Sequence, residues 1–204
     1  MPSSAVRAAD GQPPPALLET ARERLLHAAL ARFDVDGALG ATLEDIRRDA
    51  AVSVGALYHH FPDKTALAAA LYVDLARAFQ EGFVTELRAR SGAEEGVKAG
   101  VRFYLGWVCD NRAAAAFLLG GRPRGDVALA QRNYEFLSAV MAWWETHVAR
   151  GALRSLPLDV INALWLGPAH EYTRHWLAGR SKRVPSAVAD VLADAAWQTL
   201  EETT

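Results

Sequence analysis

The stretch VSVGALYHHFPDK, residues 52 to 64, sets three rings with polar tips side by side: Tyr58, His59 and His60. Leu57 and Phe61 are spaced to bury together on one helical turn, so the rings between them are expected to face solvent. Adjacent histidines on a helix diverge by about 100°, and no cysteine accompanies them, so a metal site is not expected here. Hydroxyl and imidazole groups can instead donate to the phosphates or base edges of a nucleic acid.

A lysine opens the helix that follows this stretch. Lys64 stands in its first turn, where a cation opposes the helix dipole by roughly 0.3–1 kcal/mol. The mismatch disappears where a phosphate binds, because the lysine and the free N–H groups of the helix start can hold it together. Thr42 begins another helix nearby for the same purpose, while the small residues Gly55 and Ala56 allow close approach to a groove floor.

Helices in the N-terminal third are predicted from apolar stripes at helical spacing and from capping residues. Thr42 is followed three residues later by Asp45, a capping-box pattern in its acidic variant, and Ser53 and Asp63 can cap the next two helices. The predicted helices cover residues 16–35, 42–50, 53–61 and 64 to about 90. The second and third, joined by a short turn, predict a helix-turn-helix unit within residues 16–63.

The rest of the chain also has helical periodicity. EEGVKAGVRFYLGWVCD, residues 94–110, is apolar on nearly every side, which is typical of a helix central to a bundle. Long helices are predicted at residues 126–150 and 157–178, the second bent if Pro168 lies inside it, with a last one near 188–200. There is no alternating strand pattern and no internal repeat. The prediction is an all-α protein of about nine helices.

Composition narrows the classes of protein. The 204 residues are 51% hydrophobic and 23% charged, as in ordinary globular proteins, and the net charge is −2. Residues 1–15 lack an apolar signal core and predict a disordered tail. No stretch approaches the roughly 20 apolar residues of a membrane span. Cys109 is the single cysteine, so no internal disulfide is possible, and a cytoplasmic protein is expected.

Residues 17–71 resemble the N-terminal DNA-binding domain of TetR-family transcriptional regulators. The resemblance is carried by RERLLHAALARF, Gly37, ATLEDI and above all VSVGALYHHFPDKTAL, while WLGPAHEYTRHWLAGR looks like the penultimate helix of many members. It implies a helix-turn-helix domain at residues 16–63 and a ligand-binding and dimerisation domain at 64–204. The implied function is that of a homodimeric repressor, released from a palindromic double-stranded DNA operator by a small hydrophobic or aromatic effector.

Three positions depart from the pattern of the family. Ala51 stands where glycine is usual, so a left-handed backbone there would cost about 1 kcal/mol. Arg47 replaces a usual alanine, and Val54 stands at a position that is often polar. These departures leave the predicted fold intact but blur the sequence of the operator.

Three sets of site residues are predicted. The residues expected at DNA are Thr42, Ser53, Val54, Gly55, Ala56, Tyr58, His59, His60 and Lys64. The resemblance implies an effector pocket, for which the candidates are Phe103, Trp107, Phe117, Tyr134, Met141 and Trp165, with Asn133 and His170 as polar candidates. It also implies a dimer seam, for which the candidates are Trp176, Val188, Leu192, Trp197 and Leu200. Each aromatic or aliphatic candidate has ordinary core packing as its alternative.

The charge of the DNA-binding segment leaves other functions open. Residues 16–65 carry a net charge of −2, whereas nucleic-acid domains are usually basic, yet residues 53–62 contain no acid. Modest affinity per subunit would make dimerisation important. A helical interaction protein without DNA binding is one alternative. An enzyme is another, although no nucleophile elbow, phosphate loop, HExxH pair or paired-carboxylate site is present. No cofactor or metal is expected.

Overall fold

The computed structural model describes residues 20–121 and 127–203, and within them the side chains of all but residues 38, 39 and 127–129. In these ranges the chain forms ten α-helices, one short 3-10 helix and no β-strand, so the predicted all-α class is confirmed. The predicted tail, residues 1–15, lies outside the described residues. The helices are α1 Ala21–Gly40, α2 Leu43–Asp49, α3 Val54–His60, α4 Lys64–Arg88, α5 Ala93–Asp110, α6 Arg112–Gly120, α7 Val127–Ala149, α8 Leu158–Trp165, α9 Gly167–Leu177, the 3-10 helix η1 Pro185–Val188 and α10 Ala189–Leu200.

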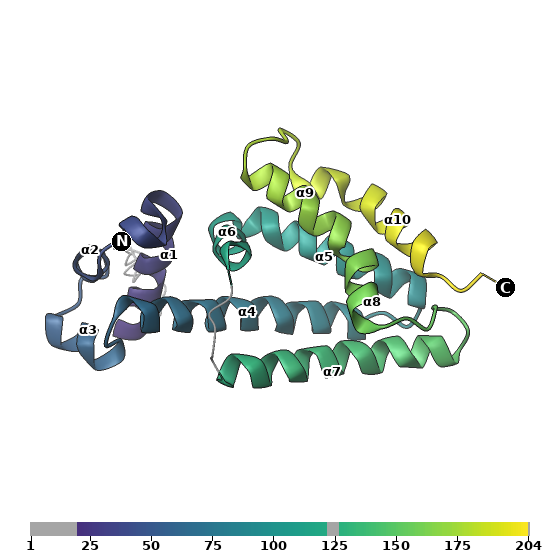
Figure 1. The fold of residues 1–204 in the computed structure, drawn as a ribbon, viewed down its shortest axis with the longest axis horizontal. Helices are drawn as coiled ribbons and strands as arrows, with labels where there is room; N and C mark the ends of the chain where they lie inside the picture. The colour runs from purple at the N-terminus through teal and green to yellow at the C-terminus, as the bar shows by residue number, and fades with distance from the viewer. Residues whose placement is uncertain (1–19, 122–126, 204) are drawn as a thin grey trace, which may run out of the picture.

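The three N-terminal helices and the start of α4 form a small unit, here called the head (residues 20–71), at one end of the molecule (Figure 1). Its core gathers one apolar face from each helix, with Leu25, Ile46, Leu57 and Leu67 all fully buried or nearly so. Short helices of two turns are marginal alone. This shared core is therefore what holds α2 and α3 in place.

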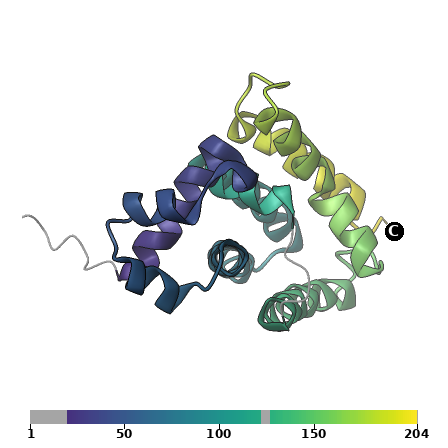
Figure 2. The same ribbon diagram turned by 60° about the vertical axis from the view of Figure 1, so that its left-hand side comes forward.

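The remaining described residues form a larger helical unit, here called the bundle (residues 72–203). Helix α5 lies between α4 on one side and α9 and α10 on the other, while α7 runs beside α4 (Figures 1 and 2). The bundle has a separate core rich in aromatic rings, including Phe83, Trp144 and Trp165. The expectation that residues 94–110 form a central helix agrees with this arrangement, because Val97, Val101 and other residues of α5 are buried.

Helix α4 joins the two units. Leu67 and Leu71 belong to the core of the head, whereas Phe83 and Leu87 of the same helix belong to the core of the bundle. A single helix of 25 residues therefore passes from one core into the other. No helix of the described residues has both the length and the apolar character that a membrane crossing requires.

Two helix boundaries differ from those predicted. The helix predicted over residues 157–178 divides into α8 and α9 at Leu166, where Pro168 stands within the first two positions of α9. Proline has no N–H and crowds the carbonyl four residues earlier, so the expected bend becomes a break. Helix α1 continues past residue 35 to Gly40, with a turn at Gly37 whose φ of 69° is readily adopted by glycine.

Candidate nucleic-acid interface

Helix α3 is fixed to the head by two side chains and presents its other faces outward. Leu57 is 1% exposed and Phe61, which ends the helix, is 3% exposed. Ile46 of α2 lies in the same core and is fully buried. The spacing of Leu57 and Phe61 on one helical turn therefore positions α3 as the sequence predicted.

The turn between α2 and α3 contains a left-handed alanine and is held by the side chain of Arg47. Ala51 has a φ of 51°, so the left-handed conformation considered for this position is present without a glycine. The guanidinium of Arg47 donates to the carbonyl oxygen of Val52 at 2.7 Å and to the carboxylate of Glu44. Arg47, noted in the sequence only as a departure, thus ties α2 to the residue that precedes α3.

Side-chain caps begin all three helices as predicted. The hydroxyl of Thr42 accepts from the backbone N–H of Asp45 at 3.1 Å, and that of Ser53 accepts from Ala56 at 3.1 Å. The carboxylate of Asp63 accepts from the N–H of Ala66 at 2.8 Å. Each cap satisfies one of the N–H groups that a helix start leaves without a partner.

The outer surface of α3 carries the predicted rings. Tyr58 is 56% exposed and Val54 is 55% exposed, and His59 and His60 are exposed beside them. The exposed Gly55 is open, since a Cβ added there would meet nothing within 4 Å. This surface has the width of a single helix, which is what a major groove admits.

Ala56 differs from Gly55 and from the expectation for it. The alanine is half-buried and packs against the core of the head, because it lies on the same side of the helix as the buried residues that follow it. A large side chain at position 56 would therefore disturb the head itself. Gly55, rather than Ala56, is the small residue through which α3 can approach another surface.

Arginines neutralise the carboxylates that flank α3. Arg32 of α1 donates to both oxygens of Asp49, and Arg48 lies 3.3 Å from a carboxylate oxygen of Asp45. The hydrogen bonds from Arg32 hold the pKa of Asp49 below its ordinary value, and those from Arg47 act in the same way on the pKa of Glu44. The acids of α2 are therefore engaged locally, which reduces the repulsion that the net charge of the segment suggested.

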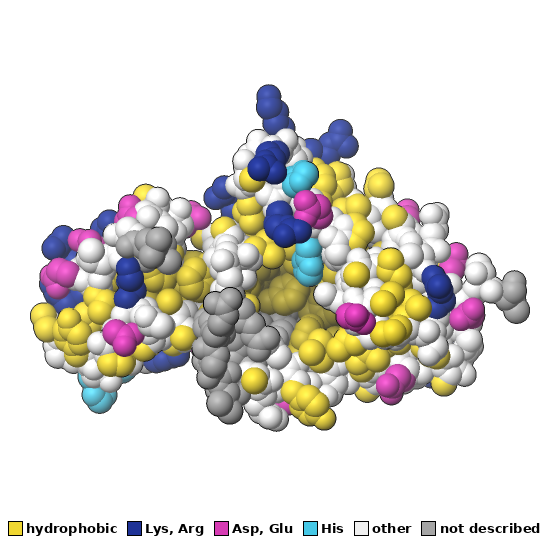
Figure 3. Space-filling model, viewed as in Figure 1, with side chains coloured by type: hydrophobic (Ala, Val, Ile, Leu, Met, Phe, Trp, Pro, Cys, Tyr) yellow, Lys and Arg dark blue, Asp and Glu magenta, His cyan; other side chains and the backbone are white. Residues whose placement is uncertain are grey.

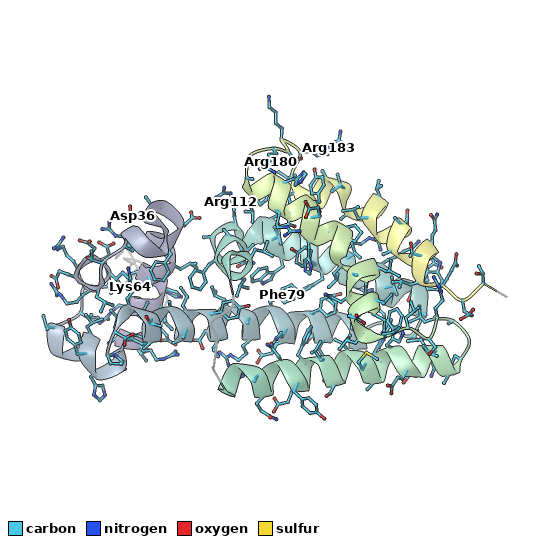
Figure 4. All side chains as sticks on the ribbon, viewed as in Figure 1. Asp36, Lys64, Phe79, Arg112, Arg180 and Arg183 are labelled. Carbon is cyan, nitrogen blue, oxygen red and sulfur yellow. The ribbon has the colours of Figure 1, made fainter. Side chains whose placement is uncertain are left out.

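Lys64 has a partner inside the head. Its ammonium donates to the carbonyl oxygen of Ala41 at 3.0 Å, across 23 residues of sequence, and the side chain is half-buried. Figure 4 shows Lys64 at the head end of α4. The lysine thus links the start of α4 to the residue after α1. Its contact with a phosphate stays a prediction.

The head also matches a known sequence family. Residues 25–71, which span the whole helix-turn-helix unit and the start of α4, match the family described as bacterial regulatory proteins, tetR family. The predicted resemblance to the TetR family is confirmed. No curated protein sequence matches the chain significantly.

Solved structures of TetR-family proteins share the fold over most of the chain. A TetR family transcription regulator from Marinobacter aquaeolei VT8 has a TM-score of 0.76 and 13% identity, covering 90% of this chain and 96% of that one. A tetR-family regulatory protein from Rhodococcus RHA1 has a TM-score of 0.68 and 18% identity, covering 91% and 100%. The fatty acid degradation regulator FadR from Bacillus halodurans has a TM-score of 0.71 and 16% identity, covering 85% and 96%. At these identities the likeness concerns the fold.

A largely apolar cavity of about 190 Å³, open to solvent on one side, lies between α4, α5, α6, α7 and α9 of the bundle. Of the six residues predicted for an effector pocket, Trp107 lines it, and so do the polar candidates Asn133 and His170. Phe103 packs beside the cavity, with its ring 5.7 Å from that of Phe79. Sequence periodicity did not distinguish Phe79, which lies between α4 and α5 (Figure 4).

The other four pocket candidates do not line this cavity. Tyr134 is 69% exposed and points away from the bundle, while Met141 packs half-buried against the core. Trp165 is a core residue whose indole N–H donates to the carbonyl oxygen of Val97 at 2.9 Å. Phe117 stacks on Phe33 of the head, with ring centroids 5.5 Å apart. For these residues the alternative of packing or exposure describes the structure.

The five seam candidates divide in a similar way. Leu200 is fully buried in the core of its own chain, so a partner cannot reach it. Trp176 and Trp197 are half-buried and pack against the bundle core. Val188 and Leu192 are partly exposed and share a helical stripe with Val191, which is 71% exposed and was not predicted.

Proposed function

We propose that the protein is a DNA-binding transcriptional regulator that acts as a homodimer. In this proposal the protein is a repressor whose head binds a palindromic operator in double-stranded DNA, and a small hydrophobic effector in the bundle releases it from that operator. Such a regulator works in the cytoplasm, where its DNA is. The proposal extends the TetR-family resemblance from fold to mechanism.

The observation that carries the proposal is the outer surface of α3. The rings of Tyr58, His59 and His60 are exposed to solvent and do not pack in the core, although the helix is only seven residues long. No acid lies in residues 53–62, and the carboxylates of α2 are paired with arginines. A free-standing polar surface of this kind fits the phosphates and base edges of a major groove.

The expected dimer is supported by the outer stripe of α10. Val188, Val191, Leu192 and Ala195 follow the spacing i, i+3, i+4 and i+7, so they form one apolar strip along α10 and the residue before it, with Leu192 at the edge that packs against the core. A two-fold dimer through this strip would set two α3 helices about one DNA turn apart, roughly 34–36 Å. Val191→Glu should convert the dimer to a monomer in sedimentation. A native protein that sediments as a monomer at micromolar concentration would refute the dimer.

Helix α6 supplies a route from the cavity to the head. Ala115, Leu118 and Leu119 line the cavity from one side of α6. From the other side, the ring of Phe117 stacks on Phe33 of α1 at 5.5 Å. A bound effector that shifts α6 would therefore act directly on α1.

An ion pair strengthens this contact between α6 and the head. The guanidinium of Arg112 lies 3.7 Å from the carboxylate of Asp34.

Linkage requires that operator DNA weaken effector binding by the same factor by which effector weakens operator binding. Equal effector affinity with and without operator, measured by calorimetry, would exclude release as the mechanism.

The first experiment is binding to DNA from the region upstream of the protein's own gene, against a scrambled duplex. Gly55→Tyr should abolish the preference for the specific duplex, because the ring would fill the space that α3 needs in the groove. Gly106→Tyr is the matched control, since a Cβ there also meets nothing within 4 Å but the residue lies on α5 of the bundle. Full preference retained by Gly55→Tyr would show that α3 is not the reader.

The second experiment separates the two roles of Lys64. A phosphate contact predicts that Lys64→Ala weakens specific and random binding equally and lowers the salt slope by roughly one unit per subunit. A role confined to the bond with Ala41 predicts lower stability of the head with an unchanged salt slope. Binding across a salt series, with unfolding measured on the same variant, decides between them.

A further inference from the structure

The volume of the cavity in the bundle indicates the scale of a molecule that could bury itself there. Its volume of about 190 Å³ is below the roughly 300–1,000 Å³ of pockets for drug-sized ligands. An apolar cavity of about 150 Å³ is known to hold benzene, so a single aromatic ring with a small substituent is the appropriate scale. Figure 3 shows a hollow lined by hydrophobic side chains at the middle of this face of the molecule.

Among the residues that the structure describes, no aspartate, glutamate, lysine or arginine lines the cavity. The lining residues are Tyr72, Ala76, Phe79, Gln80, Tyr104, Trp107, Val108, Ala115, Leu118, Leu119, Asn133, Phe136 and His170. Burial lowers the pKa of His170, with a further contribution from the positive charge of Arg174, so the imidazole is neutral at neutral pH. An anionic ligand would lose its hydration here without gaining a counter-charge.

One buried polar group in the lining has no well-formed hydrogen bond among the described residues. Tyr104 is 5% exposed, and no group of the described residues stands in good hydrogen-bond geometry to its hydroxyl, although the neighbouring hydroxyl of Thr173 acts to lower its pKa. Burial raises the pKa of Tyr104 to about 12, so the phenol stays an O–H donor at any physiological pH. Buried polar groups are rarely left unsatisfied in proteins. The edge of the His170 ring lies against this tyrosine, with ring centroids 4.6 Å apart.

Two other polar groups of the lining, on Gln80 and Asn133, engage each other. The side-chain amide of Gln80 donates to the amide oxygen of Asn133 at 2.7 Å, joining α4 to α7. Apolar walls from Phe79, Trp107 and Phe136 complete the lining. The cavity therefore combines apolar walls with a buried hydroxyl, that of Tyr104, which has no well-formed hydrogen bond among the described residues.

We propose that the cavity binds an uncharged molecule of about one aromatic ring that carries a carbonyl-type oxygen, and that the hydroxyl of Tyr104 donates to this oxygen. This assignment rests on the proposed function for its role as effector site. The binding itself is a property of the bundle. The experiment therefore uses the full-length protein without DNA, so that its failure and a failure of operator binding are separate results.

Three probes of nearly equal shape test the proposal. Acetophenone has the carbonyl, α-methylstyrene replaces the oxygen with a CH₂ group, and benzoate replaces the ketone with a carboxylate. Calorimetric titration should detect the first two and not benzoate at pH 7.5. Benzoate binding as tight as acetophenone binding would overturn the assignment to uncharged ligands.

The substitution Tyr104→Phe isolates the hydrogen bond. It should weaken acetophenone binding about three- to tenfold and leave α-methylstyrene binding within about twofold. Only the ketone oxygen accepts a hydrogen bond from the hydroxyl that the substitution removes. Tyr134→Phe is the matched control, since its ring is exposed on α7 and lies outside the cavity. An equal change for both probes would show that Tyr104 does not read the oxygen.

Two further variants locate the site and the donor. Ala76→Leu places a larger side chain in the lining and should abolish binding of both neutral probes, whereas unchanged binding would place them elsewhere. Thr173 carries the buried hydroxyl next to that of Tyr104, and it does not itself line the cavity. Thr173→Val should leave acetophenone binding unchanged. A loss as large as that of Tyr104→Phe would contradict recognition by Tyr104 alone.

Discussion

The head and the bundle are built by different means. Each of the four helices of the head begins with a capping side chain that accepts a hydrogen bond from a backbone N–H of the first turn. The capping residues are Thr20, Thr42, Ser53 and Asp63. Helices α5, α6, α8, α9 and α10 of the bundle have no such side-chain cap. The bundle relies instead on contacts among aromatic rings, such as those around Phe83.

This difference separates local from long-range determination of structure. A capping residue acts on N–H groups two or three positions away, so its effect can be read from adjacent residues. A ring cluster forms only when helices far apart in sequence meet. The head should therefore respond most to changes at single turns, and the bundle to changes in side-chain volume.

The largest effect is expected from the ring cluster. Phe83→Ala should lower the free energy of unfolding by about 3–5 kcal/mol, because it leaves a cavity in the centre of the bundle. All six tryptophans lie beyond residue 106, so their fluorescence in a denaturant titration reports on the bundle alone. Leu137→Ala, on the exposed side of α7, is the control and should change little. A cost below 1 kcal/mol would contradict the role given to the cluster.

A smaller effect is expected from the caps of the head. Ser53→Ala should cost about 0.5–2 kcal/mol, since the N–H of Ala56 loses its acceptor. Circular dichroism reports on the helices of both units and tryptophan fluorescence on the bundle alone, so a change seen only by circular dichroism in the same titration reports on the head. The exposed Ser155 lies in a connection of the bundle, and Ser155→Ala should have no measurable effect. Equal effects of the two substitutions would remove the distinction between the units.

A substitution in the turn between α2 and α3 should stabilise the protein. Ala51→Gly should stabilise the protein by up to about 1 kcal/mol, because glycine adopts the positive φ of 51° without strain. Ala89→Gly is the matched control, as Ala89 has a φ of −73° at the end of α4. There the same substitution should destabilise slightly through chain entropy. Thermal unfolding of both variants tests the sign of each change.

The smallest expected effect is a dependence of stability on pH in the bundle. Burial lowers the pKa of His170 below its ordinary value of 6.5, so the unfolded chain takes up this proton first as the pH falls. The stabilisation is complete above about pH 6.5 and is lost as the pH falls towards the pKa of the folded state. His170→Gln should therefore lose less stability than the native protein between pH 7 and 5. Parallel stability curves for the two proteins would exclude this contribution.

The sequence predicted the head better than the bundle, because capping acts between residues close in sequence whereas ring packing depends on residues far apart. The caps at Thr42, Ser53 and Asp63 follow from residue type and short spacing, and the structure contains all three. The bond between Lys64 and Ala41 spans 23 residues, so no local pattern indicated it.

Prediction failed in the bundle where the choice of face depended on neighbouring helices. Tyr134 belongs to an apolar stripe of α7 in the sequence but is exposed, because α7 contacts the rest of the bundle mainly along α4. Leu200 was predicted for the dimer seam but is fully buried in the core, on a helix that packs against α5 and α8. The cavity draws its lining from five helices, so Tyr104 and Phe79 could be identified only from the fold.

The continuity of α4 has a geometrical consequence. Its 25 residues span about 37 Å at the helical rise, from the core of the head to that of the bundle. Phe83 and Leu87 lie 16 residues, about 24 Å, from Leu67 and Leu71, so a tilt of about 5° at the first pair would displace the second by about 2 Å. A hydrogen bond to a base fails over a shorter distance than this. The helix therefore acts as a lever arm, magnifying a rotation too small to disrupt either core.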